Sequence, residues 1–145
     1  MIAGTLCRRR VATVAPGDSL RTAARRMEDD EVGTLVVVDP HLVGRAVGML
    51  TDRDLTMRCI AHALDPEATT VSQVMSSPVH TINENAPLEF ALTEMAAAAT
   101  RRLVVTGADD KIVGILSLDD LLGLLCEQAA ALSMLLQKQR PLIGV

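Results

Sequence analysis

The sequence predicts a mixed α/β fold of the α+β kind, in which a strand, helix, strand, strand, helix unit occurs twice and a long helix follows. Three observations support this fold class. The stretch "VGMLTDRDL" at residues 47–55 returns as "VGILSLDDL" at residues 113–121. Short Val-rich runs alternate with segments whose apolar residues have helical spacing. After the second stretch, leucines keep that spacing almost to the end of the chain.

The two copies align over most of their length, because residues 5–58 match residues 73–124. At an offset of 68 residues, Thr13, Val14, Leu20, Ala23, Met27 and Leu35 fall on Thr81, Ile82, Leu88, Ala91, Met95 and Leu103. Further along the offset is 66, so the first copy has two extra residues within "DPHLVGRA", which suits a loop. We therefore expect repeats at residues 1–66 and 67–126, and a helical extension and tail at residues 127–145.

In the first repeat, "VATV" predicts a short strand, and the residues "PGD" end it and cap the next helix. That helix is expected to carry Leu20, Ala24 and Met27 on one face. The run "TLVVVD" has four consecutive apolar residues, which is typical of a strand covered on both faces. A hairpin then leads to the strand "AVGML", and "TDRDLTMRCIAHA" predicts the second helix.

The second repeat predicts the same order of elements. The strand "VHTI" precedes a helix from about Pro87 to Ala98, and the strands "RLVVTG" and "KIVGIL" follow it. A last helix begins near Ser117 and is expected to stop at Pro141.

This last helix has an apolar face made of Leu118, Leu121, Leu122, Leu125, Leu132, Leu135 and Leu136. Such a face is too wide for an isolated surface helix, so something must cover it. Two possibilities are open. The face packs inside the monomer, or it meets itself across a two-fold axis in a homodimer.

Composition excludes several classes of function. With 49% hydrophobic and 22% charged residues the chain is globular, and one Phe without Tyr or Trp leaves no aromatic platform for single-stranded nucleic acid. A net charge of -4 argues against binding to nucleic acid or to an anionic membrane, since both need a basic surface. No stretch suits a signal peptide or a membrane span, so we expect a cytoplasmic protein.

The pattern of reactive side chains does not predict a metal site or an enzyme. Cysteines and histidines are scattered, at Cys7, Cys59, Cys126, His41, His62 and His80. There is no Walker-type or GxGxxG loop and no nucleophile beside a base. The paired acids Asp52 with Asp54 and Asp119 with Asp120 are expected to face the positive end of a helix dipole. We therefore expect neither catalysis nor a required cofactor.

The repeated junction between strand and helix has two interpretations. Thr51 with Asp54, and Ser117 with Asp120, have the spacing of a capping box that satisfies the first helical amides. The same geometry suits a nucleoside phosphate, because free helical amides and a hydroxyl bind phosphate and a carboxylate accepts from ribose hydroxyls. Both interpretations stay open on spacing alone.

The two junctions, each after a Val-rich strand and inside a repeat of about sixty residues, resemble paired cystathionine beta-synthase (CBS) domains. The segment "VSQVMSSPVHTI" is similar to the lead-in of such a repeat. The resemblance covers the chain from about Thr5 to Leu125. It implies two pseudo-symmetric repeats packed sheet to sheet, dimerisation, and adenine nucleotides such as AMP, ADP or ATP held in clefts between the repeats.

The resemblance also implies which residues would line two clefts. The first would consist of Ala12, Val32, Gly33, Thr34, Ser117, Asp119 and Asp120. The second would consist of Thr51, Arg53, Asp54, His80, Thr100, Arg101 and Arg102. The motif carboxylate would bind ribose, and the motif hydroxyl would lie near phosphate.

The two expected clefts differ in charge. The first has room for a base but an excess of acid, whereas the second has three arginines that suit phosphate. Small residues are common in similar proteins where this chain has Arg101 and Arg102. These two arginines either bind phosphate, fill the cleft or face a partner, or are solvated. The run Arg8 to Arg10 either reaches a phosphate or forms a solvated turn.

The favoured function is a stand-alone regulatory module that binds an adenine nucleotide, forms a homodimer and signals to a separate effector protein. No effector domain is recognisable in the sequence. The alternative is an interaction module whose ligand clefts are vestigial and whose useful surface is the apolar last helix.

Overall fold

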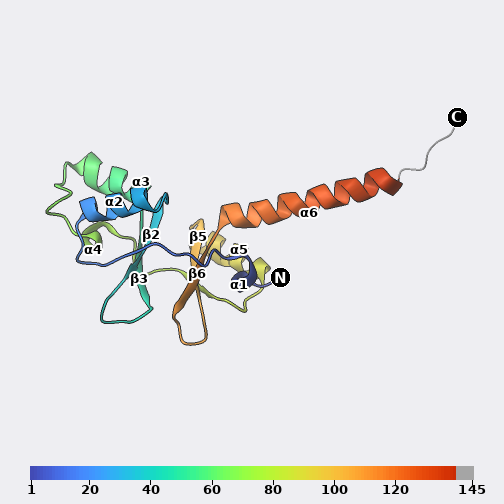
Figure 1. Ribbon diagram of the computed structural model, residues 1–145, viewed down its shortest axis with the longest axis horizontal. Coiled ribbons are helices and arrows are strands. Elements are labelled where there is room, and N and C mark those ends of the chain that lie inside the picture. Colours follow the sequence, from blue (N-terminus) through green and yellow to red (C-terminus); the bar gives the residue numbers. More distant parts are fainter. Residues whose placement is uncertain (140–145) are drawn as a thin grey trace.

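The computed structural model describes residues 1–139 and contains two three-stranded sheets, with the shorter helices on their outer sides and one long helix that projects away (Figure 1). The strand order is β1-β2-β3 in one sheet and β4-β5-β6 in the other. In each sheet the first pair of strands is parallel and the second pair is antiparallel. The α+β fold class and its two repeats are thus confirmed.

The first repeat begins with β1 (Thr13–Val14), α2 (Leu20–Asp29), β2 (Thr34–Val38) and β3 (Ala46–Thr51). Ser19 caps α2 by accepting a hydrogen bond from the Thr22 amide at 3.1 Å. The cap was expected at residues 16–18, and it lies one position after that range, at Ser19. The buried face of α2 consists of Leu20, Ala23 and Met27, whereas Ala24, which was expected on this face, is exposed.

The segment after β3 is helical throughout but irregular. It consists of α3 (Asp52–Asp54), a π-helical turn η1 (Leu55–Cys59) and a 3-10 turn η2 (Ile60–His62). Ala63 then adopts a left-handed conformation with φ of 54°, which ends the helical path. The expected helical segment is therefore present, and the structure adds that it is irregular.

The second repeat contains β4 (Thr81–Asn83), α5 (Leu88–Ala97), β5 (Arg102–Thr106), β6 (Ile112–Ser117) and α6 (Leu118–Gln139). Its antiparallel register repeats that of the first sheet, because Arg102 pairs with Ser117 where Thr34 pairs with Thr51. Both hairpins have a bulge at the matching position. The expected stop at Pro141 lies outside the described residues.

The two repeats exchange their lead-in segments, which was not expected from the sequence. The N-terminal segment with α1 (Ala3–Leu6) packs on the second repeat, where Arg8 and Ile115 exchange two backbone hydrogen bonds of 2.9 and 3.0 Å. The segment with α4 (Val71–Val74) packs on the first repeat, where Ser76 and Met49 exchange two bonds of 2.9 and 3.0 Å. The division of the sequence into repeats between residues 66 and 67 stays a prediction. In the structure, a segment from each side of this boundary packs on the repeat of the other side.

Each repeat has its own apolar cluster between its sheet and its helices. Leu35 and Val37 belong to the first cluster, and Leu103 and Val105 belong to the second. Val36 and Val104 are also 0% exposed yet belong to neither cluster. Because side chains alternate across a strand, they lie on the opposite faces of their sheets, which are turned toward the other repeat. The junctions that end β3 and β6 therefore lie at the boundary between repeats.

Candidate functional site

The two junctions between strand and helix both have the geometry of a capping box. The Thr51 amide donates to an Asp54 carboxylate oxygen at 2.9 Å, and the Asp54 amide donates to the Thr51 hydroxyl at 3.1 Å. At the second junction the Ser117 amide donates to Asp120 at 3.0 Å and the Asp120 amide donates to Ser117 at 3.2 Å. Capping is thus an observed role of both carboxylates, and any ligand role comes in addition to it.

A first cleft of about 240 Å³ lies where the N-terminal lead-in, the end of β6 and the start of β2 meet. Its lining consists of Arg8, Arg10, Val11, Ala12, Glu31, Val32, Gly33, Thr34, Val36, Arg102, Ile115, Ser117, Asp119 and Asp120. Every residue expected in the first cleft from the sequence lies in this lining. The aliphatic side chains come from the lead-in and strands, and the polar ones from the junction.

Among the carboxylates of this cleft that form an ion pair, Asp120 is the most buried. Only 11% of its side chain is exposed. One of its oxygens accepts from the Ser117 hydroxyl at 2.6 Å, and the other accepts from Arg8 Nε at 3.0 Å. Burial acts to raise the pKa of Asp120, but the bonds from Ser117 and Arg8 outweigh it and lower the pKa below its ordinary value. Asp120 is therefore an ionised hydrogen-bond acceptor at neutral pH.

Arg8 and Arg10 bring positive charge to this cleft. The Arg8 side chain is 72% exposed although it pairs with Asp120, and Arg10 is 93% exposed and lies 3.9 Å from Asp30. Both guanidinium groups are exposed and can turn toward an anion, provided that another donor replaces them at the largely buried carboxylates of Asp120 and Asp30. The first cleft thus has arginines as well as acids, which corrects the expected excess of acid.

A second cleft of about 140 Å³ occupies the matching position in the other half of the molecule. Its lining consists of Met49, Thr51, Asp54, Ser76, Pro78, Val79, His80, Thr100 and Arg102. Here Asp54 lies 3.5 Å from Arg58, which belongs to the same helical segment and also donates to the Val74 carbonyl at 2.7 Å. The acid of the second cleft is therefore held by a residue outside the cleft lining.

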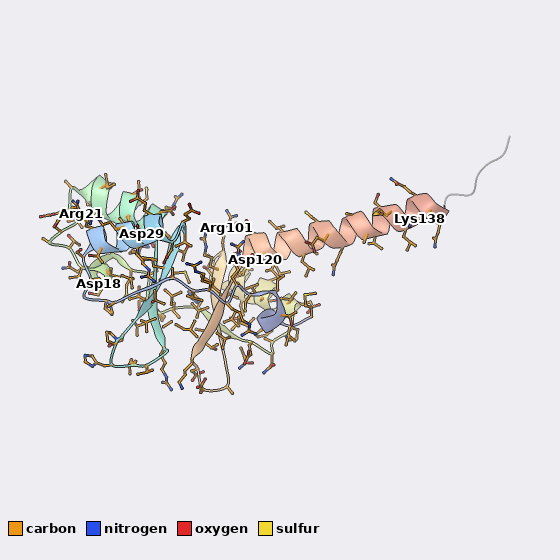
Figure 2. All side chains as sticks on the ribbon, in the orientation of Figure 1. Asp18, Arg21, Asp29, Arg101, Asp120 and Lys138 are labelled. Atoms are coloured by element: carbon orange, nitrogen blue, oxygen red, sulfur yellow. The ribbon has the colours of Figure 1, made fainter. Side chains whose placement is uncertain are left out.

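Two of the expected arginines do not line the second cleft. Arg101 instead pairs with Asp119 at 3.2 Å, and both side chains are more than two-thirds exposed, at 69% and 68%. Figure 2 shows Arg101 and Asp120 close to the base of α6, where the two repeats meet. Arg53 is also exposed and absent from the lining. The expectation of three arginines in the second cleft is thus corrected to one.

Arg102 lines both clefts, and its guanidinium makes no hydrogen bond or ion pair with any other residue of the described chain. It takes the place that Thr34 has in the first repeat. A long side chain in place of a short one accounts for part of the smaller volume of the second cleft. Arg102 also adds a cation without a partner to the first cleft.

Thr34 has an unusual hydroxyl. Its Oγ1 atom is buried and has no hydrogen-bond partner within residues 1–139. An unsatisfied buried hydroxyl costs about 1–3 kcal/mol, and polar groups of this kind often lie at functional sites. Its position in the lining of the first cleft agrees with a site built for a polar ligand.

The cleft residues missed from the sequence come mainly from the exchanged lead-ins. At the offset of 68 residues, Arg8, Arg10, Val11 and Ala12 correspond to Ser76, Pro78, Val79 and His80, and all eight line their clefts. The alignment already matched Ala12 with His80. The alignment, which starts at residue 5, also matched Arg8 with Ser76, but it could not show that each lead-in packs on the other repeat.

Other kinds of site find no support in the described part of the chain. Among residues 1–139, no three His, Cys, Asp or Glu side chains come together in a way that could hold a metal ion. None of the described helices combines the length and apolar character that crossing a bilayer requires.

Comparison with known proteins assigns the family. The sequence matches the family described as CBS domain twice, over residues 3–60 and over residues 71–127. The chain therefore belongs to the CBS domain family and contains two copies of the domain.

Two relatives show how far the likeness extends. The chain is 40% identical over 111 residues to the CBS domain-containing protein YhcV of Bacillus subtilis, covering 77% of this chain and 76% of that protein. It is 28% identical over 119 residues to the uncharacterized protein MK0525 of Methanopyrus kandleri, covering 82% of this chain and 60% of that protein. The chain thus spans less than two thirds of the MK0525 sequence.

A solved structure with the same fold contains a ligand. The CBS domain protein PAE2072 from Pyrobaculum aerophilum, complexed with AMP, has a TM-score of 0.78 and 25% sequence identity. The match covers 90% of this chain and 99% of that one. At least one protein with a fold similar to that of this chain therefore binds AMP.

Proposed function

We propose that this protein is a regulatory binding module that holds one adenine nucleotide in the first cleft. The observation that carries the proposal is that one cleft combines the Ser117 and Asp120 pair, three arginines and aliphatic walls. The AMP bound to PAE2072 supports the class of ligand. The expectation of no catalytic role is kept, and a cytoplasmic location agrees with such a ligand.

The ribose would bind at Asp120. Among residues 1–139, one Asp120 oxygen accepts only from Arg8, whose exposed side chain has room to move away when another donor takes its place. A ribose hydroxyl can replace Arg8 there, while Ser117 continues to hold the other oxygen and keeps the helix capped. Binding would therefore exchange an ion pair for a hydrogen bond to the sugar and release the Arg8 guanidinium.

The phosphates would bind to the released Arg8 together with Arg10 and Arg102. Guanidinium groups donate in pairs to phosphate oxygens, and such charge-assisted bonds are about twice as strong as neutral ones. Arg102 has no partner to give up among the described residues. Because up to three cations are within the cleft, ATP and ADP should bind more tightly than AMP.

The adenine would lie among the aliphatic side chains of the lining. Val11, Ala12, Val32, Val36 and Ile115 supply this surface. A base held in this way needs no aromatic partner, which fits a chain with one Phe and no Tyr or Trp. Most ligand pockets combine such apolar walls with a few convergent polar groups.

A thermal shift assay tests the function directly. AMP, ADP and ATP at about 100 times the dissociation constant should stabilise the protein by about 2.7 kcal/mol. NAD, S-adenosylmethionine and cyclic dinucleotides serve as comparison ligands. No shift with any adenine nucleotide would contradict the proposal and favour the alternative function described below.

The same assay with two variants separates phosphate binding from general charge. Arg8→Ser introduces the residue that the second cleft has at this position, and Arg9→Ser is the matched control, because Arg9 is exposed and does not line the cleft. Loss of a charge-assisted bond of about 1.5–3 kcal/mol should weaken ATP binding about 10- to 100-fold in Arg8→Ser. AMP binding should change less, and Arg9→Ser should bind ATP as the wild type does.

A second candidate function rests on the projecting helix. From Leu125 to Gln139 every residue of α6 is exposed, including several leucines. This surface suits an interaction module, and a homodimer or a separate effector protein would be its partner. The two functions are compatible, because α6 begins at the junction that lines the first cleft.

A further inference from the structure

The helix α6 leaves the body of the protein after its first turns. Leu121 is buried in the second repeat, but Leu122, Leu125, Leu132 and Leu136 are 47%, 52%, 62% and 66% exposed. Figure 1 shows α6 extending away from both sheets. At 1.5 Å per residue the 22-residue helix is about 33 Å long. The exposed leucines from Leu122 to Leu136 therefore have no cover within the described chain.

The exposed face has the spacing of a coiled coil. Apolar residues occur at alternating steps of four and three, which is the a and d pattern of a heptad. The stripe begins with Leu118, which is half-buried against the second repeat, and continues with the exposed residues Leu122, Leu125, Ala129, Leu132 and Leu136. A seam of this kind packs against another helix that has the same pattern.

Charge on α6 favours an identical helix running in the opposite direction. The first turn has Asp119 and Asp120, Glu127 follows near the middle, and the last turn has Lys138. A parallel pair would put the two acidic first turns beside each other, whereas the two Glu127 residues lie level with each other in either direction. An antiparallel pair brings Lys138 of each copy toward the acidic first turn of the other and also opposes the two helix dipoles. In Figure 2, Lys138 and Asp120 lie at opposite ends of the helix.

We propose that α6 forms an antiparallel two-stranded coiled coil with α6 of a second copy of this chain. The register that pairs every residue of the stripe with another one places Leu118 opposite Leu136, Leu122 opposite Leu132, and Leu125 opposite Ala129. The two-fold axis then passes close to Glu127. A register one heptad away would instead pair Gln139 with Leu122 in the seam.

The base of α6 offers a place for the tip of the partner helix. An apolar groove of about 200 Å³ lies between α5 and α6, with Leu88, Leu92, Leu121 and Leu125 in its lining. Leu125 belongs both to this groove and to the stripe, so the two surfaces are continuous. In the antiparallel arrangement the tip of each helix runs back toward the other copy's groove, which extends the contact beyond the coiled coil itself.

Light scattering coupled to size exclusion tests the contact. Leu132→Asp combined with Leu136→Asp should halve the mass of the assembly, because it puts four acids into the seam. Met134→Asp is the matched control, since Met134 is 59% exposed on the opposite face of the same helix. An equal mass for the double variant and the wild type, or a monomeric wild type, would overturn the proposal. None of these residues lines a cleft, so nucleotide affinity should stay unchanged.

Distance measurement between spin labels tests the direction. A nitroxide is attached through Gln137→Cys, which leaves Lys138 in place, in a Cys126→Ser background, where the two other cysteines are buried and burial raises the pKa of the Cys7 thiol. The antiparallel register separates the two labels by about 20 residues of helix, or about 30 Å. A parallel pair would bring them close to the helix spacing of about 8–10 Å, and that result, or a distribution without a defined peak, would refute the arrangement.

Discussion

Asp120 combines a structural and a chemical role in one side chain. It accepts from the Ser117 amide and hydroxyl, which fixes the first turn of α6, and it accepts from Arg8, which closes one side of the first cleft. Asp54 has the same capping role but pairs with Arg58 instead. The two motif acids are thus equivalent in the sequence and different in the partner that holds them.

The pKa of Asp120 predicts a dependence of stability on pH. Because the folded pKa lies below the ordinary value of 3.8, the stabilisation by this carboxylate is complete above that value and is lost as pH falls through the folded pKa. Carbon-13 NMR of the side-chain carboxyl should give a midpoint below 3.8. The difference in free energy of unfolding between the wild type and Asp120→Asn should shrink below about pH 4. A midpoint above the ordinary value would contradict this assignment of hydrogen bonds.

The exchanged lead-ins determine how each junction is completed. Each lead-in crosses a glycine in the third strand of the sheet that it covers: Met75 and Ser76 lie against Gly48, and Cys7 and Arg8 lie against Gly114. A β-carbon at Gly114 would be 2.6 Å from Cys7 Sγ and 2.8 Å from the Arg8 carbonyl oxygen. Glycine at these positions therefore allows the lead-in to reach the cleft.

Gly114→Ala should for this reason displace the segment that carries Arg8. We expect a loss of about 1–3 kcal/mol in the free energy of unfolding, because a backbone atom has to move, together with weaker ATP binding. Gly123→Ala is the control, since nothing lies within 4 Å of that position in α6. It should stabilise the protein by about 0.5–1 kcal/mol. Chemical denaturation of both variants makes the comparison, and equal stability of Gly114→Ala and the wild type would show that the lead-in is not held as described.

Local patterns in the sequence predicted most elements and both junctions. Hydrophobic spacing and the repeat are local signals, so the strands, α2, α5 and the start of α6 followed from them. The exchange of lead-ins did not, because it pairs Arg8 with Ile115 and Met49 with Ser76 across long separations that periodicity does not record. For the same reason the arginines Arg8 and Arg10 were not assigned to the first cleft.

The sequence also did not predict the direction in which individual side chains point. Arg101 has the position of Gly33 in the first repeat, but its long side chain pairs with the exposed Asp119, so it does not line the cleft that Arg102 lines. Likewise, Arg53 lies between Thr51 and Asp54 on a helical turn and points away from the side that they share. In the first cleft, every residue expected from the sequence lies in the lining.

The molecule as a whole is a pseudo-symmetric pair with unequal clefts. Both clefts have a hydroxyl and an acid three residues apart, but only the first has arginines from the lead-in and the larger volume. Arg102 increases this difference, because it takes space from the second cleft and brings charge to the first. A symmetric fold can in this way produce a single ligand site per chain.

Calorimetric titration of ATP into the wild type, Asp120→Asn and Asp54→Asn tests this single site most directly. Both variants lose one capping carboxylate, so their effects on helix stability cancel in the comparison. One ATP should bind per chain in the wild type and in Asp54→Asn, and Asp120→Asn should bind at least about tenfold more weakly. Two ATP molecules per chain, or unchanged affinity in Asp120→Asn, would contradict a nucleotide site in the first cleft.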